Sequence, residues 1–308
     1  MALGASIRGW RHCRPVVVVD GTYLNGHYGG TLFTACTQDA NNSIFILTFG
    51  IEDTENDRSW TWFLGNLKKA HGDREGLCFV SDRHNNIKNA IGNVYPGACH
   101  GICSYHLLQN LKSRYGRSGH NVTQPFNAAI RAYTLIEYEY HMQELYAINN
   151  EVVPEKWSRF HMPRNRYSTM TSNIVESVNA VTKSAKHFPV IALLESLWQT
   201  TQTWFCKHKD TAQGAFTTLS SKYEKYIRAM STVMRNFKVS PINQSTFLVS
   251  GETSSFIVNI EQRTYTCRTL QVNQLPCPHA LATIASMKMD PYDFCSYYYT
   301  REAYMNAY

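Results

Sequence analysis

Four consecutive valines, Val16 to Val19, are followed directly by an aspartate, Asp20. An unbroken run of β-branched residues is typical of a strand that is buried on both faces of a sheet. An isolated carboxylate at the end of such a strand is costly to bury unless it is paired or binds a metal ion. The run therefore predicts a central strand over residues 15–20. Asp20 is then either a turn-capping residue or a metal ligand.

The segments after this strand predict an α/β fold with a mixed sheet. Two further strands, 31–37 and 43–50, follow short connections and are expected to form an antiparallel meander with the first. Alternating elements come next, namely helix 59–70, strand 77–80, helix 86–94 and strand 98–103. Three meander strands followed by alternating helices and strands indicate a mixed sheet with helices on its faces.

The rest of the chain is expected to be helical up to about residue 240. Helical patterns cover 104–115, 125–149, 174–186, 189–208 and 213–238, with an irregular stretch at 150–173. Beyond them, alternating segments at 246–249 and 256–260 predict a hairpin, and a short helix is expected over 278–287. We therefore divide the chain into a domain over 1–240 and a smaller region over 241–308.

Two more carboxylates stand where they can meet Asp20. Asp82 follows the predicted strand 77–80, and Glu176 opens a predicted helix as the only acidic residue between 156 and 187. Three carboxylates from two strands and a helix can hold two hard cations about 3.5–4 Å apart, which activate water and stabilise a phosphate leaving group. The competing interpretation is structural, because Asp caps turns and Glu in a first helical turn favours the helix dipole.

Nine cysteines, an odd number, in a chain without a secretory signal favour buried thiols or metal ligands over disulfides. Cys103 and His106 lie three residues apart, on one face if the segment is helical. They indicate either a zinc site with the nearby Cys99 and His100, or a core thiol beside a hydrogen-bonded imidazole. A cysteine hydrolase is disfavoured, since the sequence has no nucleophile elbow.

Cys267, Cys277 and His279 form a stronger zinc pattern. A thiolate in a loop and a Cys-x-His at a helix start fill three positions of a tetrahedral site. Tyr265 stands where a fourth thiolate would fit, and a phenol is a poor ligand for Zn²⁺. Cys295 is an alternative fourth ligand. The pattern therefore predicts a structural zinc site whose occupancy depends on that fourth position.

Charge is unevenly distributed along a chain with a net charge of +7. Residues 83–120, 156–187 and 207–238 are rich in Lys and Arg, whereas 137–155 holds five Glu and no Lys or Arg. The basic segments are either solvated helix faces or a channel for the phosphates of nucleic acid. No apolar run approaches the roughly 18 residues that span a bilayer. We expect an intracellular protein with no membrane and no small-molecule substrate as partner.

Several long motifs, in the same order, resemble those of the Mutator-like element (MULE) transposases, the MuDR group that is abundant in plants. The opening of their transposase domain is similar to CRPVVVVDGTYLNGHYGGTLFTACTQDANNSIFILTFGIEDTENDRSWTWFLGNL. Their second acidic motif resembles SDRHNNIKNAI, and their Cys-x-x-His element resembles ACHGICSYHLLQN. The segment with their third acid is similar to RYSTMTSNIVESVNAV. A SWIM zinc finger, whose pattern is Cys-x-Cys, a spacer and Cys-x-His, resembles RTYTCRTLQVNQLPCPHALATI.

The resemblance implies an RNase H-like core of the DDE type, with a helical insertion over about 104–173. Its triad would be Asp20, Asp82 and Glu176, which would hold two Mg²⁺ or Mn²⁺ ions. The implied reaction is attack of water on a phosphodiester at terminal inverted repeats, followed by attack of the freed 3′-hydroxyl on target DNA. The Cys-x-x-His signature formed by Cys103 and His106 is expected to serve the structure of the core or to contact DNA.

The family also implies Zn²⁺ at the SWIM module, a nuclear location, and DNA as partner, both as transposon ends and as target. A homo-oligomer is compatible with it. Tyr265 departs from the family pattern, because it replaces the first SWIM cysteine. Related full-length proteins carry a DNA-binding region upstream of the core, and this chain starts almost at the core. We therefore expect a truncated product or a fragment with weak recognition of element ends.

Two alternatives to an active transposase stand beside it. One is a catalytically silent, transposase-derived regulator of transcription, of the far-red-impaired-response type. The other is a decayed relic without function. Retained carboxylates favour the enzyme, whereas the departure at Tyr265 favours the alternatives.

Overall fold

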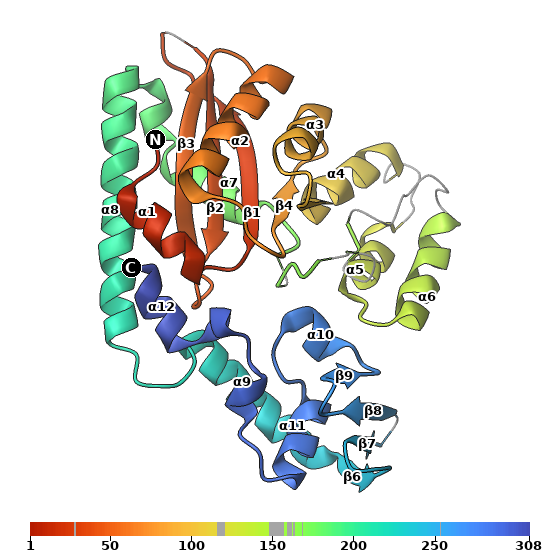
Figure 1. Cartoon of the computed structure of the whole chain (residues 1–308). Coiled ribbons are helices and arrows are strands. Elements are labelled where there is room, and N and C mark those ends of the chain that lie inside the picture. The colour runs from red at the N-terminus through yellow and green to blue at the C-terminus, as the bar shows by residue number, and fades with distance from the viewer. Residues whose placement is uncertain are drawn as a thin grey trace.

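The computed structural model describes residues 1–27, 29–115, 121–147, 157–158, 162, 164–167, 169–252 and 254–308. It is a mixed α/β structure with two sheets (Figure 1). The first sheet has five strands in the order β3-β2-β1-β4-β5, and the second has four in the order β6-β7-β8-β9. None of the helices in the described ranges is long and apolar enough to cross a lipid bilayer.

The five-stranded sheet contains the predicted meander. β1 (Val16–Tyr23), β2 (Thr31–Gln38) and β3 (Ile44–Glu52) pair antiparallel in sequence order, as expected. β4 (Cys78–Ser81) pairs with β1 in parallel, and β5 (Cys99–Ile102) pairs with β4 in parallel. The valine-rich strand therefore lies at the centre of a mixed sheet, which explains why both of its faces are apolar.

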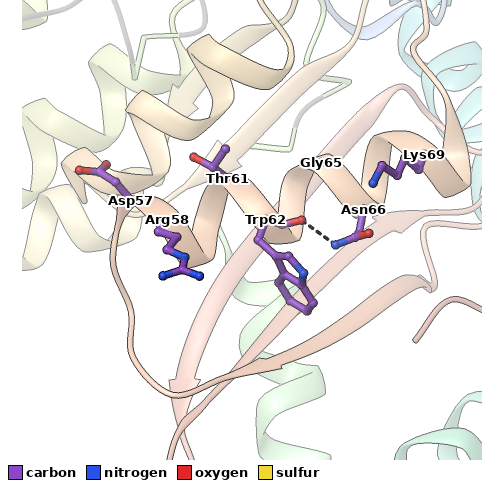
Figure 2. A pocket seen from close by; sticks show the side chains of 7 residues that line it. All are labelled: Asp57, Arg58, Thr61, Trp62, Gly65, Asn66 and Lys69. Atoms are coloured by element: carbon purple, nitrogen blue, oxygen red, sulfur yellow. Dashed lines mark hydrogen bonds between the residues drawn. The ribbon is translucent and has the colours of Figure 1, made fainter.

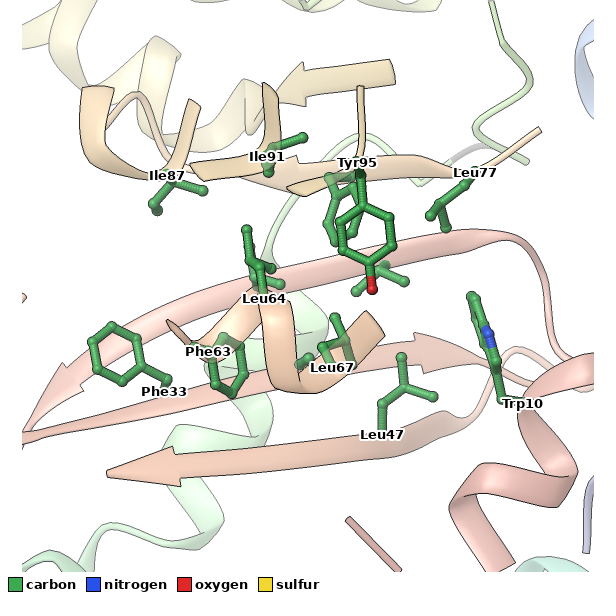
Figure 3. Close-up of a cluster of buried hydrophobic side chains, with 14 of the residues drawn as sticks. Trp10, Phe33, Leu47, Phe63, Leu64, Leu67, Leu77, Ile87, Ile91 and Tyr95 are labelled. Carbon is green, nitrogen blue, oxygen red and sulfur yellow. The ribbon is translucent and has the colours of Figure 1, made fainter. Parts of the chain in front are cut away.

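Two helices cover one face of this sheet (Figure 1). α2 (Asp57–His71) begins two residues before the predicted start, because the side chain of Asn56 accepts a hydrogen bond from the Ser59 backbone and caps the helix. α3 (Asn85–Val94) follows β4. Aromatic and aliphatic side chains from both helices and the sheet form the largest core (Figure 3), including Trp10, Phe33, Leu47, Phe63, Leu64, Leu67, Leu77, Ile87, Ile91 and Tyr95.

The opposite face is covered by α7 (Asn173–Val181) and α8 (Val190–Gln213). Side chains alternate along β1, so that Val17 and Val19 join the core under α2 and α3, whereas Val16 and Val18 pack with Val175 of α7. Asp20 continues the second series and therefore lies on the α7 face.

A helical insertion separates β5 from α7. Its helices are α4 (Ser104–Tyr115), α5 (Thr123–Arg131) and α6 (Leu135–Tyr146), which share a small core of their own. The helical pattern predicted over 125–149 corresponds to two helices, α5 and α6, in the residues that the structure describes. Thr134 forms a capping box with Glu137, which starts a new helix there. Much of the predicted irregular stretch 150–173 lies outside the described residues.

The C-terminal part contains the small second sheet. After α9 (Ser221–Val233), the strands β6 (Lys238–Pro241), β7 (Thr246–Ser250), β8 (Ser255–Asn259) and β9 (Thr264–Tyr265) form an antiparallel sheet, to which the predicted hairpin contributes its two central strands. The helices α10 (Thr269–Asn273) and α11 (Pro278–Ser286) close its core. The predicted helix 213–238 is shorter than expected, because α8 continues to Gln213 and α9 starts only at Ser221.

The first and last helices of the chain pack together beside the five-stranded sheet (Figure 1). No element was predicted for residues 1–12, which form α1 (Gly4–Gly9) and a 3₁₀ turn, Trp10–His12. The last helix, α12 (Arg301–Ala307), packs on α1 and α8. Ala307 is buried in the same core as Trp10, so the end of the chain returns to the five-stranded sheet.

Candidate functional site

Asp20 lies near the carboxyl end of β1, beneath α7. Its Oδ2 accepts a hydrogen bond of 2.8 Å from Asn179 Nδ2. Burial is the main cause that raises the pKa of Asp20 to about 7. The charges of Asp82 and Glu176 raise it as well. These three carboxylates therefore repel one another in a partly dry site, and a bound cation would relieve that repulsion.

Asp82 stands beside Asp20 on the sheet. The parallel register sets Val18 opposite Val80, and each aspartate follows its valine by two residues. Asp82 Oδ1 accepts a hydrogen bond of 3.2 Å from the backbone of His84, which forms the turn into α3. The sequence expectation that two neighbouring strands bring these side chains to one edge therefore agrees with this register.

Glu176 comes from the first turn of α7. Its Oε1 accepts a hydrogen bond of 2.8 Å from Ser172 Oγ and lies 3.7 Å from His106 Nε2. Asn179 follows one helical turn later, so that α7 presents both side chains from one face. The helix α7 thus carries both Glu176, the third acid of the predicted triad, and Asn179, which donates a hydrogen bond to Asp20.

Cys103 and His106 lie beside Glu176, at the junction of β5 and α4. Cys103 is fully buried; its Sγ accepts a hydrogen bond of 3.2 Å from the backbone N–H of Ser172 and lies 3.2 Å from the Ser172 hydroxyl. The ligand atoms of Cys103, His106 and Glu176 all lie within 4.8 Å of one another. Cys99 is not part of this group, and His100 Nε2 instead contacts Ser81 Oγ at 2.8 Å.

Asp20 and Asp82 do not join Glu176 in a group as tight as that one. In the described part of the chain, two sets of three metal-ligating side chains gather within 4.8 Å, and neither set contains Asp20 or Asp82. Two cations 3.5–4 Å apart bind ligands on their outer sides as well as between them. The carboxylates that serve such a pair are therefore spread more widely than the ligands of one ion.

Three residues that the sequence analysis did not single out surround Asp20. Glu55 lies against Gly21, because a Cβ added to Gly21 would be 3.3 Å from the carboxyl carbon of Glu55. The charge of Glu55 also raises the pKa of Asp20. Lys186 donates a hydrogen bond of 2.7 Å to Thr22 on the same face of β1. Asn179 was open to prediction, because it is three residues after Glu176 on a predicted helix. Glu55 and Lys186 carried no such signal.

The C-terminal cluster fits zinc. Cys267 Sγ lies 3.6 Å from Cys277 Sγ, and Cys277 Sγ lies 3.7 Å from His279 Nδ1. Ligands at zinc distances in a tetrahedron lie roughly 3.5–3.8 Å apart, so the three atoms have the spacing of ligands that share one ion. A hydrogen bond from Cys277 lowers the pKa of the Cys267 thiol, which favours the thiolate that zinc binds.

Tyr265 packs in the same core as the cysteines of this cluster. Its ring is 2% exposed and belongs to the same core as Cys267 and Cys277. Its hydroxyl is buried and has no hydrogen-bond partner among the residues that the structure describes. The alternative ligand Cys295 contacts the Pro291 carbonyl at 3.5 Å and is not grouped with the other three residues. Cys267, Cys277 and His279 therefore offer three ligands, and Cys295 does not join them.

A surface hollow of about 550 Å³ lies along α2 (Figure 2). Its lining comes from one helix, with Trp62 between the charged side chains of Arg58 and Lys69. α2 covers the sheet face opposite α7. The hollow is therefore separate from the carboxylates, and it contains none of the grouped metal-ligating side chains.

Comparison with known proteins finds a family match over the strands that carry Asp20 and Asp82. The family model of the MULE transposase domain matches residues 16–110. This part of the chain is therefore similar to the MULE transposase domain. The match includes Asp20, Asp82, Cys103 and His106, and it ends before Glu176 and the C-terminal cysteines. A transposase domain of this kind implies DNA binding in general.

The chain also has a curated relative in a plant. The chain is 28% identical over 142 residues to the putative protein FAR1-RELATED SEQUENCE 10 of Arabidopsis thaliana. The alignment covers 45% of this chain and 21% of the relative, so the chain spans about a fifth of that protein's length. A chain from the cryo-EM structure of the simian T-cell lymphotropic virus intasome in complex with PP2A regulatory subunit B56 gamma matches 59% of this chain and 46% of its own length, with 11% identity and a TM-score of 0.30.

Proposed function

We propose that the chain is the catalytic part of a DDE-type DNA transposase of the Mutator-like class, with an RNase H-like core. The observation that carries the proposal is the electrostatic coupling of Asp20 to Asp82 and Glu176 at one end of the MULE domain. A carboxyl whose pKa is raised by burial and by neighbouring acids, as that of Asp20 is, is typical of functional sites. These three acids would hold two Mg²⁺ or Mn²⁺ ions.

The bound cations would activate a water molecule and stabilise the charge on the phosphate. The chain's own residues hold the ligands in place. Asn179 orients the carboxylate of Asp20, and Ser172 orients that of Glu176. We propose that water attacks a phosphodiester first, and that the freed 3′-hydroxyl then attacks target DNA.

Strand cleavage tests the proposal directly. Labelled duplex DNA is incubated with the chain in Mg²⁺ or Mn²⁺, and the products of wild type, Asp20→Asn and Glu176→Gln are compared. Cleavage by wild type that both variants lose supports the triad. The matched control is Glu261→Gln, an exposed acid in the loop between β8 and β9. If Asp20→Asn cleaves as fast as wild type, the triad assignment is wrong.

DNA is the proposed partner, as transposon ends and as target, in the nucleus. The three basic segments motivate this, since Lys and Arg neutralise phosphates and release counterions. Binding to duplex DNA is expected to weaken steeply as salt rises, and an affinity that does not change with salt would contradict it. We also propose a domain over 1–240, a SWIM-type zinc module over 241–308, and a homo-oligomer as the form compatible with transposition.

A catalytically silent, transposase-derived regulator of transcription is the alternative function. Tyr265 motivates it, because the loss of one zinc ligand is a change that a protein freed from transposition can tolerate. Binding of DNA without cleavage in either metal, by wild type and by Glu176→Gln alike, would favour this alternative over the enzyme.

A further inference from the structure

A cluster of three different ligand types lies at the edge of the proposed catalytic centre. The atoms that Cys103, His106 and Glu176 offer to a metal lie within 4.8 Å of one another. His106 Nε2 is 3.7 Å from Glu176 Oε1, which is longer than a good hydrogen bond. It is close to the spacing of roughly 3.4 Å that a nitrogen and an oxygen have when both bind one tetrahedral zinc ion.

The chemistry of this set differs from that of the three carboxylates. Sulfur, imidazole nitrogen and carboxylate oxygen are the ligands that Zn²⁺ takes in proteins. Mg²⁺ is bound by oxygen alone, and a thiolate selects soft or borderline metals over it. The cluster at Cys103 is thus suited to a metal that the proposed catalytic centre does not use.

Ser172 touches all three ligands and is itself 1% exposed. Its backbone N–H and its hydroxyl both lie 3.2 Å from Cys103 Sγ, where they would stabilise the charge of a metal-bound thiolate. The same hydroxyl lies 2.8 Å from Glu176 Oε1 and 3.5 Å from His106 Nδ1. Metal ligands are commonly oriented by such outer contacts.

The positions of the ligands are fixed by backbone contacts, and the cluster is open to solvent. Cys103 N donates a hydrogen bond of 2.7 Å to the Ser81 carbonyl, and Ser104 N donates one of 2.9 Å to the Met170 carbonyl. The side chains of His106 and Glu176 are each 38% exposed. An ion can therefore enter from solvent, and water or a phosphate oxygen can take the fourth position.

We infer that Cys103, His106 and Glu176 bind a transition metal of the zinc type, separate from the C-terminal zinc cluster. The inference rests on the proposed function in one respect only, namely that Glu176 is also a ligand of the proposed catalytic cations. When Glu176 Oε1 is bound to zinc, only Oε2 is left for the ions that Asp20 and Asp82 hold. Zinc at this site and magnesium at the proposed catalytic centre therefore compete for one carboxylate.

Titration with Co²⁺ tests the site without relying on DNA cleavage. Thiolate-bound Co²⁺ gives sulfur-to-metal charge-transfer absorption, which cobalt bound by carboxylates alone does not give. The full-length chain carries Cys267→Ser and Cys277→Ser, so that the C-terminal cluster contributes no sulfur. One equivalent of Co²⁺ is expected to produce the band, and adding Cys103→Ser is expected to abolish it. Glu176→Gln is expected to weaken Co²⁺ binding about tenfold or more.

The matched control is Cys206→Ser, which removes an exposed thiol on α8 and is expected to leave the band unchanged. His106→Gln is the second variant. It replaces a partly exposed side chain, spares the core, and is expected to weaken binding about tenfold or more. If the serine pair unfolds the C-terminal module, the otherwise unchanged chain is used, where Cys103→Ser must remove part of the band.

A chain without the band in the serine background overturns the site, and so does a band that survives Cys103→Ser. Failure of the proposed function has a different signature. A chain that binds Co²⁺ through Cys103 and cleaves no DNA retains the metal site and refutes only the enzyme.

Discussion

Asn179 donates a hydrogen bond of 2.8 Å from Nδ2 to Asp20 Oδ2, and so joins α7 to the centre of the five-stranded sheet across 159 positions of sequence. Asn179 and Glu176 share one face of α7. The bond therefore fixes two acids of the proposed triad relative to each other. It also leaves Asn179 Oδ1 buried and without a partner among the described residues, facing the same region.

Replacing Asn179 by alanine is expected to weaken binding of Mn²⁺ about 10–100-fold, the usual effect of losing a residue that orients a metal ligand. The measurement is calorimetric titration of the metal-free chain with Mn²⁺, together with the cleavage rate. Asn173→Ala, at the exposed start of the same helix, is the control and is expected to change neither. Equal Mn²⁺ affinity in Asn179→Ala and wild type would show that the hydrogen bond is only structural.

Asp39 is expected to make the stability of the protein depend on pH. Its carboxylate is fully buried and accepts hydrogen bonds from the backbones of Asn41 and Ser43 and from the hydroxyl of Tyr308. Burial nevertheless raises the pKa of Asp39 from 3.8 to about 6. The native state therefore holds this proton more tightly than the unfolded chain. The stabilisation is complete below about pH 4 and is lost as pH rises to about 6.

Chemical denaturation of wild type and Asp39→Asn at several pH values measures this effect. A shift of about two pKa units corresponds to roughly 3 kcal/mol. The free energy of unfolding of wild type, relative to that of Asp39→Asn, is expected to fall by about that amount between pH 4 and pH 7. Asn keeps an oxygen for the Asn41 and Ser43 donors and has no charge to desolvate. A difference that stays constant across this range would exclude Asp39 as the titrating group.

The sequence predicted those parts of the site that come from regular elements. The valine run ending at Asp20 and the short strand before Asp82 have patterns typical of buried strands, and the structure pairs these two strands in parallel. Glu176 was placed on a helix for the same reason. Local pattern also singled out Cys267, Cys277 and His279 as candidate zinc ligands, because their spacing is itself a chemical signal, and the structure brings the three together.

Contacts that depend on tertiary packing were not predictable. Glu55 reaches Asp20 from the loop before α2, because Gly21 leaves room for its carboxylate. Lys186 reaches the same face from a 3₁₀ turn. The first and last helices have no strong periodicity of their own, and each is held by packing on the other. Neighbours far apart in the chain decide such positions, and a single sequence does not record them.

Gly9 is where the two ends of the chain touch most closely. A Cβ at this position would lie 2.0 Å from the Ala307 carbonyl oxygen and 2.8 Å from the ring of Phe45. The backbone of α12 would have to move, so Gly9→Ala is expected to lower the free energy of unfolding by about 1–3 kcal/mol or more. The matched change is Gly65→Ala in α2, which meets no atom within 4 Å and is expected to stabilise the helix by about 0.5–1 kcal/mol. Denaturant unfolding of both variants and of wild type measures these changes. A free energy of unfolding of Gly9→Ala equal to that of wild type would mean that α12 moves without cost.

Tyr265 tests how many ligands the C-terminal cluster supplies to zinc. Tyr265→Phe removes only the hydroxyl, which is buried without a partner. If that hydroxyl is not a zinc ligand, zinc affinity stays the same and the chain becomes more stable by roughly 1 kcal/mol, since an unsatisfied polar group leaves the core. A large loss of zinc affinity in Tyr265→Phe would instead identify the phenol as the fourth ligand.

Tyr265→Cys provides the opposite change at the same position. A thiolate there would add a ligand that zinc prefers, next to Cys267, Cys277 and His279. We expect zinc affinity, measured by competition with a chromophoric chelator, to rise at least tenfold above that of wild type. The variant also loses the buried ring, so its metal-free form is expected to be less stable by about 3 kcal/mol. Zinc then restores more stability to Tyr265→Cys than to wild type, because an ion that binds the native state alone stabilises it by an amount that grows with the logarithm of its affinity.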